Sequence, residues 1–287
     1  MGPLELVKLD RLMARSSGSS QVVIGLIDGP VAMDHPDLSV AHIREVSTQH
    51  GASCSLAGSV ACMHGTFVAG MLLAKRGSSA PAICPDCTLL VRPIFPENSA
   101  ANGQMPSATP EELATAVTDS ISAGAHVINL SAALIQPLSR GEHQLELALD
   151  YAAQRGVLVV AAAGNQGTVG SSAITRHPWV IPVVACDHQG RPTAESNLGS
   201  TIGRWGLAAP GQGIVSLGAR SLPQTSSGTS AAAPFVTGTI ALLWSEFPKA
   251  TAAQIKLAVT QAGRPPRRTI APPLLDAWAA YEAMSRN

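Results

Sequence analysis

Gln21-Val-Val-Ile-Gly-Leu-Ile27, followed at once by Asp28, is the stretch of this chain that decides its fold. A continuous apolar run of this length is typical of a parallel strand that is buried on both faces of a sheet. Further apolar runs recur along the chain, and segments of helical character separate them. Strands that alternate with helices predict an α/β protein whose mostly parallel, doubly wound sheet lies between two layers of helices. The predicted strands are 21–27, 88–94, 125–130, 157–162 and 180–185.

The predicted helices are 65–73, 110–122, 142–155, 229–247 and 252–261, the first of them following a loop. The helix from Pro110 has the clearest start: Thr109 can cap it, proline suits its first turn, and the next two residues are acids that face the positive helix end. No internal repeat or low-complexity linker divides the chain. Residues 1–287 are therefore expected to form a single domain, with a core over about residues 20–262.

Composition excludes several classes of protein. With 46% hydrophobic and 13% charged residues, the chain is not a disordered protein. The 19 basic and 19 acidic residues give no net charge and form no basic run, so neither nucleic acid nor an anionic membrane is an expected partner. No apolar run approaches the roughly 20 residues that span a bilayer. The sequence gives no indication of an oligomeric state.

The N-terminal residues lack the charged region and apolar core of a secretory signal, which favours a cytoplasmic protein. Because the first strand starts near residue 21, no folded prosegment can precede it within this chain. We expect an enzyme that is made without one, and the alternative of a removed segment stays open.

Five cysteines leave two alternatives open. Cys84-Pro-Asp-Cys87 has a spacing found in zinc and redox sites, but no second pair of ligands accompanies it. Reduced thiols in a loop before a strand are therefore the preferred interpretation. Cys54 and Cys62 could close a short disulfide loop beside His64, and the sequence does not decide whether they do.

Polar residues follow three of the predicted strands. Asp28 ends the first, 129–133 follows another, and Gly164 and Asn165 follow a third. In open parallel sheets, ligands bind at the carboxyl ends of the strands. These residues are therefore expected to meet on one rim of the sheet.

Three short segments carry the residue types that serine-based peptide hydrolysis needs. Asp28 stands in Leu-Ile-Asp-Gly-Pro-Val, His64 in His-Gly-Thr-Phe-Val-Ala-Gly, and Ser230 in Ser-Gly-Thr-Ser-Ala-Ala-Ala-Pro. Such chemistry requires a nucleophile, an imidazole to take its proton, a carboxylate to orient the imidazole, and donors for the oxyanion. Taken singly, each residue has an ordinary structural explanation as a cap or a turn residue. Together, in this order, they indicate a catalytic triad.

These segments resemble the subtilase family of serine proteases, whose triad has the order Asp, His, Ser. The resemblance extends over about residues 20–262 and includes His35-Pro36-Asp37-Leu38, the stretch Ala161-Ala-Ala-Gly-Asn-Gln-Gly-Thr-Val-Gly-Ser-Ser172 and Ala209-Pro210-Gly211. It implies a subtilisin-like fold and a serine endopeptidase. It further implies that the Asn165 amide and the Ser230 backbone N–H bind the oxyanion.

The resemblance also implies where a peptide substrate binds. Asn129-Leu130-Ser131-Ala132-Ala133 matches the family's substrate-binding edge, to which the peptide adds as an antiparallel strand. The pocket for the residue before the cut is expected at Ala162, Ala163 and Gly164. Arg176 lies near the expected pocket floor and could favour an acidic or polar residue there; a solvated surface arginine is the alternative.

Cys87-Thr-Leu-Leu-Val-Arg-Pro-Ile-Phe-Pro-Glu97 and Asp28-Gly-Pro-Val31 are more similar to the cyanobactin-type subtilases, which mature ribosomal precursor peptides. One branch of these enzymes makes macrocycles and carries a helical insertion between the Asp and the His. Here only 36 positions separate Asp28 from His64, so hydrolysis is expected rather than transamidation.

The expected function is therefore removal of a leader from a precursor peptide. A general intracellular protease is the first alternative. An inactive peptide-binding relative is less favoured because no triad residue is lost, and a nucleotide-binding enzyme would need a glycine-rich fingerprint after the first strand. No cofactor is expected. Calcium stays open because the family's ligands match no particular residues, and no metal ligand is assigned.

Overall fold

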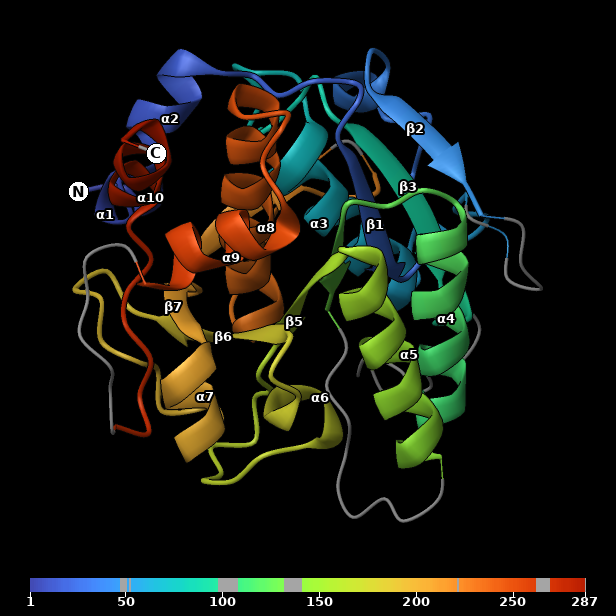
Figure 1. The fold of residues 1–287 in the computed structure, drawn as a ribbon. Helices are drawn as coiled ribbons and strands as arrows, with labels where there is room; N and C mark the ends of the chain where they lie inside the picture. The colour runs from blue at the N-terminus through green and yellow to red at the C-terminus, as the bar shows by residue number, and fades with distance from the viewer. Residues whose placement is uncertain are drawn as a thin grey trace.

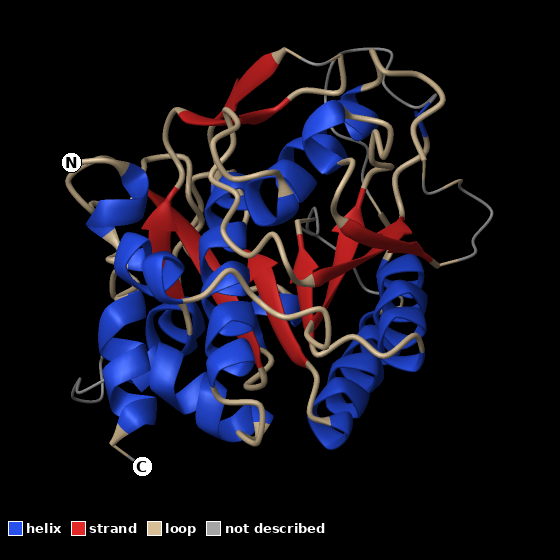
Figure 2. Cartoon of the chain, turned by 90° about the horizontal axis from the view of Figure 1, so that it is seen from above, coloured by secondary structure: helices blue, strands red, loops and turns tan. Residues whose placement is uncertain are grey.

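A seven-stranded parallel sheet forms the centre of the computed structural model, which describes residues 1–46, 51, 53–97, 108–131, 141–220, 222–261 and 269–286. All described pairings in this sheet are parallel. The α/β class and the three layers predicted from the sequence are confirmed (Figures 1 and 2). In spatial order the strands are β2 (His42–Glu45), β3 (Thr88–Pro93), β1 (Val23–Asp28), β4 (Val127–Leu130), β5 (Leu158–Ala162), β6 (Val180–Cys186) and β7 (Leu207–Pro210).

Helices cover both faces of the sheet, as Figure 1 shows for α8 on one face and for the pair α4 and α5 on the other. On the α8 side lie α2 (Leu9–Arg15), α3 (Val60–Leu73), α8 (Thr229–Glu246), α9 (Ala252–Gln261) and α10 (Ala277–Ser285). The opposite side carries α4 (Pro110–Ser122), α5 (Glu142–Arg155) and α6 (Ala173–Arg176). The remaining elements are α1 (Pro3–Leu6), η1 (Pro36–Leu38), α7 (Ser200–Trp205) and the antiparallel hairpin of β8 (Ile214–Leu217) and β9 (Pro223–Ser226).

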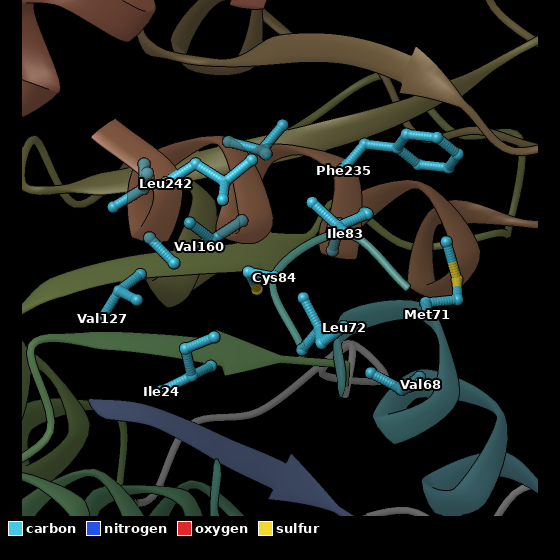
Figure 3. Packing of buried hydrophobic residues seen from close by; sticks show 14 of the residues in the cluster. Ile24, Val68, Met71, Leu72, Ile83, Cys84, Val127, Val160, Phe235 and Leu242 are labelled. Atoms are coloured by element: carbon cyan, nitrogen blue, oxygen red, sulfur yellow. The ribbon is translucent and has the colours of Figure 1, made fainter. Parts of the chain in front are cut away.

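Alternate residues of β1 enter two separate hydrophobic clusters. Ile24 and Leu26 pack on the α8 side, whereas Val23 and Ile27 pack on the α4 side. This alternation is the period of two that a strand imposes on its side chains, and every residue of β1 is buried. Figure 3 shows the first cluster, in which Ile24 lies among side chains of α3, β4, β5 and α8. The apolar run that predicted a doubly covered strand is thereby confirmed.

The order of the strands places β1 at the point where the chain reverses its direction of travel across the sheet. Its neighbours are β3 on one side and β4 on the other. Such a switch point opens a crevice at the carboxyl ends of the strands. Asp28, the last residue of β1, lies at this crevice.

Local signals account for the helix starts. The Thr109 hydroxyl accepts a bond from Glu112 N–H, and the Glu112 side chain accepts one from Thr109 N–H, so α4 begins with the predicted cap. Elements that the sequence did not predict include β2, β7 and the β8–β9 hairpin, whose strands are only four residues long. No helix among the described residues is long and apolar enough to cross a membrane.

Candidate active site

Asp28 is fully buried at the carboxyl end of β1. Its Oδ1 accepts hydrogen bonds from the Gly29 backbone N–H, at 2.6 Å, and from His64. Its Oδ2 is also buried and has no hydrogen-bond partner among the described residues. The two bonds to Oδ1 fix the orientation of the carboxylate toward His64.

His64 lies inside α3 and not in the loop that the sequence predicted before residue 65. The helix starts earlier because the Ser59 side chain caps it by accepting a bond from Cys62 N–H. Glycine at position 65 lets α3 approach the end of β1: a Cβ there would lie 2.4 Å from the Pro30 carbonyl oxygen. This close approach carries His64 to Asp28.

Two hydrogen bonds join the three predicted triad residues into one chain. His64 Nδ1 lies 2.7 Å from Asp28 Oδ1, and His64 Nε2 lies 3.0 Å from Ser230 Oγ. Burial lowers the pKa of His64, but the charge of Asp28 and its hydrogen bond together raise this pKa above the ordinary 6.5. The imidazole can therefore take a proton from Ser230 on one side while Asp28 holds it on the other.

Ser230 lies in the first turn of α8, as predicted. N–H groups in a first turn have no partner within the helix, and their dipoles favour negative charge. Gly228, which precedes the helix, has a φ of 120° that other residues rarely adopt. The turn therefore depends on glycine and brings the Ser230 hydroxyl within reach of His64.

Asn165 follows β5 in an exposed loop, and α8 fixes its side chain. Asn165 Oδ1 accepts hydrogen bonds from Thr229 N–H, at 2.9 Å, and from the Thr229 hydroxyl, at 3.0 Å. With its oxygen engaged, the amide nitrogen is left as a donor, and it lies beside Gly228, where a Cβ would be 3.0 Å from it. The predicted oxyanion donor therefore lies beside the turn that carries Ser230.

The expected substrate edge lies in register with Asp28. Ile27 pairs with Leu130, and Leu130 pairs with Ala161. The next residues along each strand are Asp28, Ser131 and Ala162, which therefore form one row at the rim of the sheet. Ala163 and Gly164 continue from this row, whereas Ala132 and Ala133 lie outside the described residues.

The side chains of Asn129 and Leu130 point into the protein instead of toward a substrate. Asn129 is fully buried, accepts a bond from the Thr237 hydroxyl at 2.8 Å, and donates one to Ser131 Oγ at 2.8 Å. Leu130 packs in the cluster beneath α4 and α5. Both residues also lie within β4, which pairs with β1 on one side and with β5 on the other. A peptide is therefore expected to contact the residues that follow them, from Ser131 onward.

The structure places Arg176 at the end of α6, where two carboxylates of α5 hold it. Its guanidinium lies 2.8 Å from Glu142 Oε2 and 2.7 Å from Glu146 Oε1. The hydrogen bonds to Glu146 and then Glu142 raise the pKa of Arg176, so its charge is fixed and already paired. This pairing weakens the prediction that Arg176 attracts an acidic substrate residue.

The sequence did not predict a cavity of about 570 Å³ that borders Gly228. Its charged lining residues are Asp187, Arg191 and Glu195. Arg191 forms an ion pair with Asp187 at 2.8 Å, and Glu195 is exposed. Two acids and one base leave this cavity with a net negative charge at neutral pH.

Cys54 and Cys62 form a disulfide, one of the alternatives that the sequence left open. Cys84 and Cys87 are free and buried, which agrees with the preferred interpretation as reduced thiols. Within the described parts of the chain, the one cluster with metal-binding residue types is Cys54, Cys62 and Glu97. Its two sulfurs are bonded to each other, so they are not available as ligands.

Comparisons with known proteins agree with this geometry. The model of the subtilase family matches residues 19–270. Subtilisin DY of Bacillus licheniformis is 30% identical over 258 residues, which cover 88% of this chain and 87% of that protein. The thermostable alkaline protease of Halalkalibacterium halodurans is 30% identical over 239 residues, and the chain spans 61% of its length.

Solved structures give the same result. The protease domain of PatA superimposes with a TM-score of 0.85 at 30% identity, over 94% of this chain and 98% of that one. The prenylagaramide maturation protease PagA gives 0.83 at 27% identity, over 96% and 98%. The chain therefore belongs to the subtilase family and is a serine endopeptidase. Subtilases in general need no cofactor, and calcium is optional for them.

Proposed function

We propose that this subtilase cleaves peptide bonds through an acyl-enzyme, with Ser230 as nucleophile, His64 as general base and acid, and Asp28 as the residue that orients His64. The observation that carries the proposal is the continuous chain of two hydrogen bonds from Asp28 through His64 to Ser230. An inactive peptide-binding protein would not require this complete arrangement.

The reaction begins when Ser230 Oγ forms a bond to the scissile carbonyl carbon and its proton passes to His64 Nε2. The carbonyl oxygen becomes an oxyanion, which the Asn165 amide and the Ser230 backbone N–H stabilise. The C–N bond then breaks, and His64 gives the proton to the departing amine. In the second half of the reaction, water loses a proton to His64 and its oxygen forms a bond to the ester carbon. The bond between that carbon and Ser230 Oγ then breaks, the carboxylic acid product leaves, and His64 returns the proton to Ser230 Oγ.

The substrate would lie across the rim of the sheet. Residues before the cut would lie as an added strand against the segments that leave the sheet at Ser131 and at Ala162–Gly164. Residues after the cut would enter the cavity that Ser227 and Gly228 line, because these residues come directly before the turn that carries Ser230. Its net negative charge favours a basic residue on the departing side.

We further propose that the substrate is a precursor peptide from which a leader is removed. Support comes from PatA and PagA, since both are maturation proteases by name and both align over nearly the whole chain. Water rather than an amine would finish the reaction. Only 36 positions separate Asp28 from His64. The described residues between them form η1, the edge strand β2 and the start of α3, where Cys62 is joined to Cys54.

A general protease is the second candidate, which the 30% identity to subtilisin DY favours. Digestion of a defined precursor peptide beside casein separates the two. The proposal predicts cleavage of the precursor at one site and slow turnover of casein. Degradation of casein at a comparable rate, with many cuts in the precursor, would contradict peptide maturation but not the triad.

A further inference from the structure

Asn197 makes an unusual number of hydrogen bonds to the loop that carries Asn165. Its Oδ1 accepts from Gln166 N–H at 3.0 Å, from Thr168 N–H at 3.1 Å and from the Thr168 hydroxyl at 3.1 Å. Its Nδ2 donates to the Ala163 carbonyl at 3.2 Å and to Gln166 Oε1 at 2.7 Å. One partly buried side chain therefore holds three residues of this loop.

The backbone of Asn197 adds a further contact, because its N–H donates to the Gly164 carbonyl at 2.9 Å. The approach is close: a Cβ on Gly164 would lie 2.3 Å from Asn197 Nδ2, and Gly164 has a φ of 105°. Position 164 therefore requires glycine for its conformation and for the space that Asn197 occupies.

These bonds reach both sides of Asn165, to Gly164 before it and to Gln166 after it, and none of them ends on Asn165 itself. The Asn165 side chain is held separately by Thr229. The two sets of bonds therefore have different roles, because Thr229 sets the orientation of the amide, whereas Asn197 sets the position of the backbone that carries it. An oxyanion donor must be fixed before the reaction, since reorganisation in the transition state costs rate.

We propose that Asn197 is a positioning residue for catalysis, which places the Asn165 amide for the oxyanion without touching the substrate. This inference rests on the proposed function, in which Asn165 is the donor. Asparagine suits the position because a single planar group must accept from N–H groups and donate to carbonyls at the same time. Aspartate would keep the acceptor and lose both donated bonds, and leucine of similar size would lose every side-chain bond.

The alternative is that Asn197 only stabilises the fold. Replacement of a residue that only stabilises the fold lowers the unfolding temperature but leaves the rate of the folded enzyme unchanged. Replacement of a positioning residue lowers kcat in the folded enzyme, and the size of this loss depends on the presence of the Asn165 amide. A double-mutant cycle measures that dependence directly.

The experiment compares Asn197→Leu, Asn197→Asp, Asn165→Ala and the double variant Asn165→Ala/Asn197→Leu, with Gln189→Ala as control on the same exposed loop. Loss of one oxyanion donor lowers kcat by about 10²–10³-fold in this type of site. We expect Asn197→Leu to lower kcat by about 10–100-fold, which is part of that loss. The same substitution should cost less than about threefold when Asn165 is already alanine, because the amide that it positions is gone.

A peptide aldehyde provides a second readout, since its adduct with Ser230 places an oxyanion in the same position. Its inhibition constant should rise with the fall in kcat, whereas a non-covalent peptide product should bind nearly as before. Asn197→Asp, which retains an acceptor, should fall between wild type and Asn197→Leu and keeps the test valid if the leucine variant does not fold.

Three outcomes would overturn the inference. Folded Asn197→Leu and Asn197→Asp enzymes with wild-type kcat would make Asn197 a stabilising residue only. Equal losses in the wild-type and Asn165→Ala backgrounds would show that it acts independently of the amide. Asn165→Ala with undiminished kcat would instead contradict the oxyanion assignment, and with it the role of Asn197, while leaving the triad untouched.

Discussion

The two halves of the active site are built in different ways. Asp28, His64 and Ser230 transfer the proton, and they come from β1, α3 and α8, whose residues form the hydrophobic core. Asn165 lies instead in an exposed loop that the side chains of Thr229 and Asn197 hold by hydrogen bonds. Core packing fixes the first half and polar bonds fix the second.

This difference predicts two kinds of response to substitution. Each triad residue performs a step that no neighbour can replace, so its loss removes nearly all activity. In the oxyanion half, several contacts each contribute part of the positioning of Asn165. Single substitutions there should therefore lower kcat only partly, by amounts that differ from one contact to another. Substitutions in both halves, with expected effects from complete loss to almost none, test that contrast.

Ser230→Ala should abolish turnover, because no other group in the site can form the acyl-enzyme. For subtilisin, from which the magnitude is taken, the loss in kcat is about 10⁶-fold. Release of a fluorogenic peptide product measures the rate. Retained turnover in the folded variant would show that another residue is the nucleophile.

Asp28→Asn should lower kcat by about 10⁴-fold and change the pH dependence. In the wild-type enzyme Asp28 raises the pKa of His64 above 6.5, and His64 must be neutral to accept a proton. The kcat/KM of the wild type should therefore rise with pH and reach half of its maximum above pH 6.5. In the variant, kcat/KM should reach half of its maximum at a lower pH.

Two results would contradict this electrostatic account. One is a wild-type kcat/KM that reaches half of its maximum at or below pH 6.5, and the other is a half-maximum at the same pH in Asp28→Asn as in the wild type. Initial rates at substrate concentrations far below KM, between pH 5 and pH 9, give the required profile. Circular dichroism at each end of this range serves as the control for folding.

Thr229→Val should lower kcat by about tenfold, less than the loss of the Asn165 amide itself. Valine removes the hydroxyl that binds Asn165 Oδ1 and that accepts from Gly164 N–H, but it retains the shape and the backbone N–H. Thr229→Ser is the matched control and should stay close to wild type. A threefold or smaller difference between these variants would assign the orientation of Asn165 to other contacts.

Glu195→Gln should change specificity more than rate. With one acid removed, the cavity beside Gly228 becomes neutral, and the preference for a basic residue after the cut should fall by a few fold, as for an exposed charge pair. Paired substrates with Lys or Gln at that position measure the ratio. An unchanged ratio would mean that the departing side of the substrate does not enter this cavity.

Arg176→Ala is expected to have the smallest effect. Because Glu142 and Glu146 already pair with the guanidinium, its removal should change the preference for the residue before the cut by less than about twofold. Profiling with a peptide library provides the measurement. A selective loss of acidic substrates would restore Arg176 as a specificity residue.

The sequence predicted the triad residues and Asn165, but not the polar contacts that hold Asn165 in place. Apolar runs located β1, β4 and β5, and the residues after them met at the rim because parallel strands end on the same edge. His64 was identified but placed in a loop, since the Ser59 cap that begins α3 earlier gives a weak signal in sequence.

Other features depend on contacts between distant segments, which periodicity does not reveal. Asn129 was expected in the substrate-binding edge, but Thr237 of α8 binds its side chain within the core. Arg176 was expected near a pocket, and the two glutamates that hold it lie on another helix. Asn197 carries no motif at all, and its importance becomes visible only when the loop around Asn165 lies beside it.

Covalent labelling tests the central claim most directly. The enzyme is treated with a fluorophosphonate, and the adduct is located by mass spectrometry of its peptides, with Ser230→Ala as control. The account predicts one adduct, on Ser230, formed at a rate that parallels the loss of activity, and no labelling of the variant. An adduct on another residue, or inactivation without modification of Ser230, would contradict the assignment of Ser230 as the nucleophile.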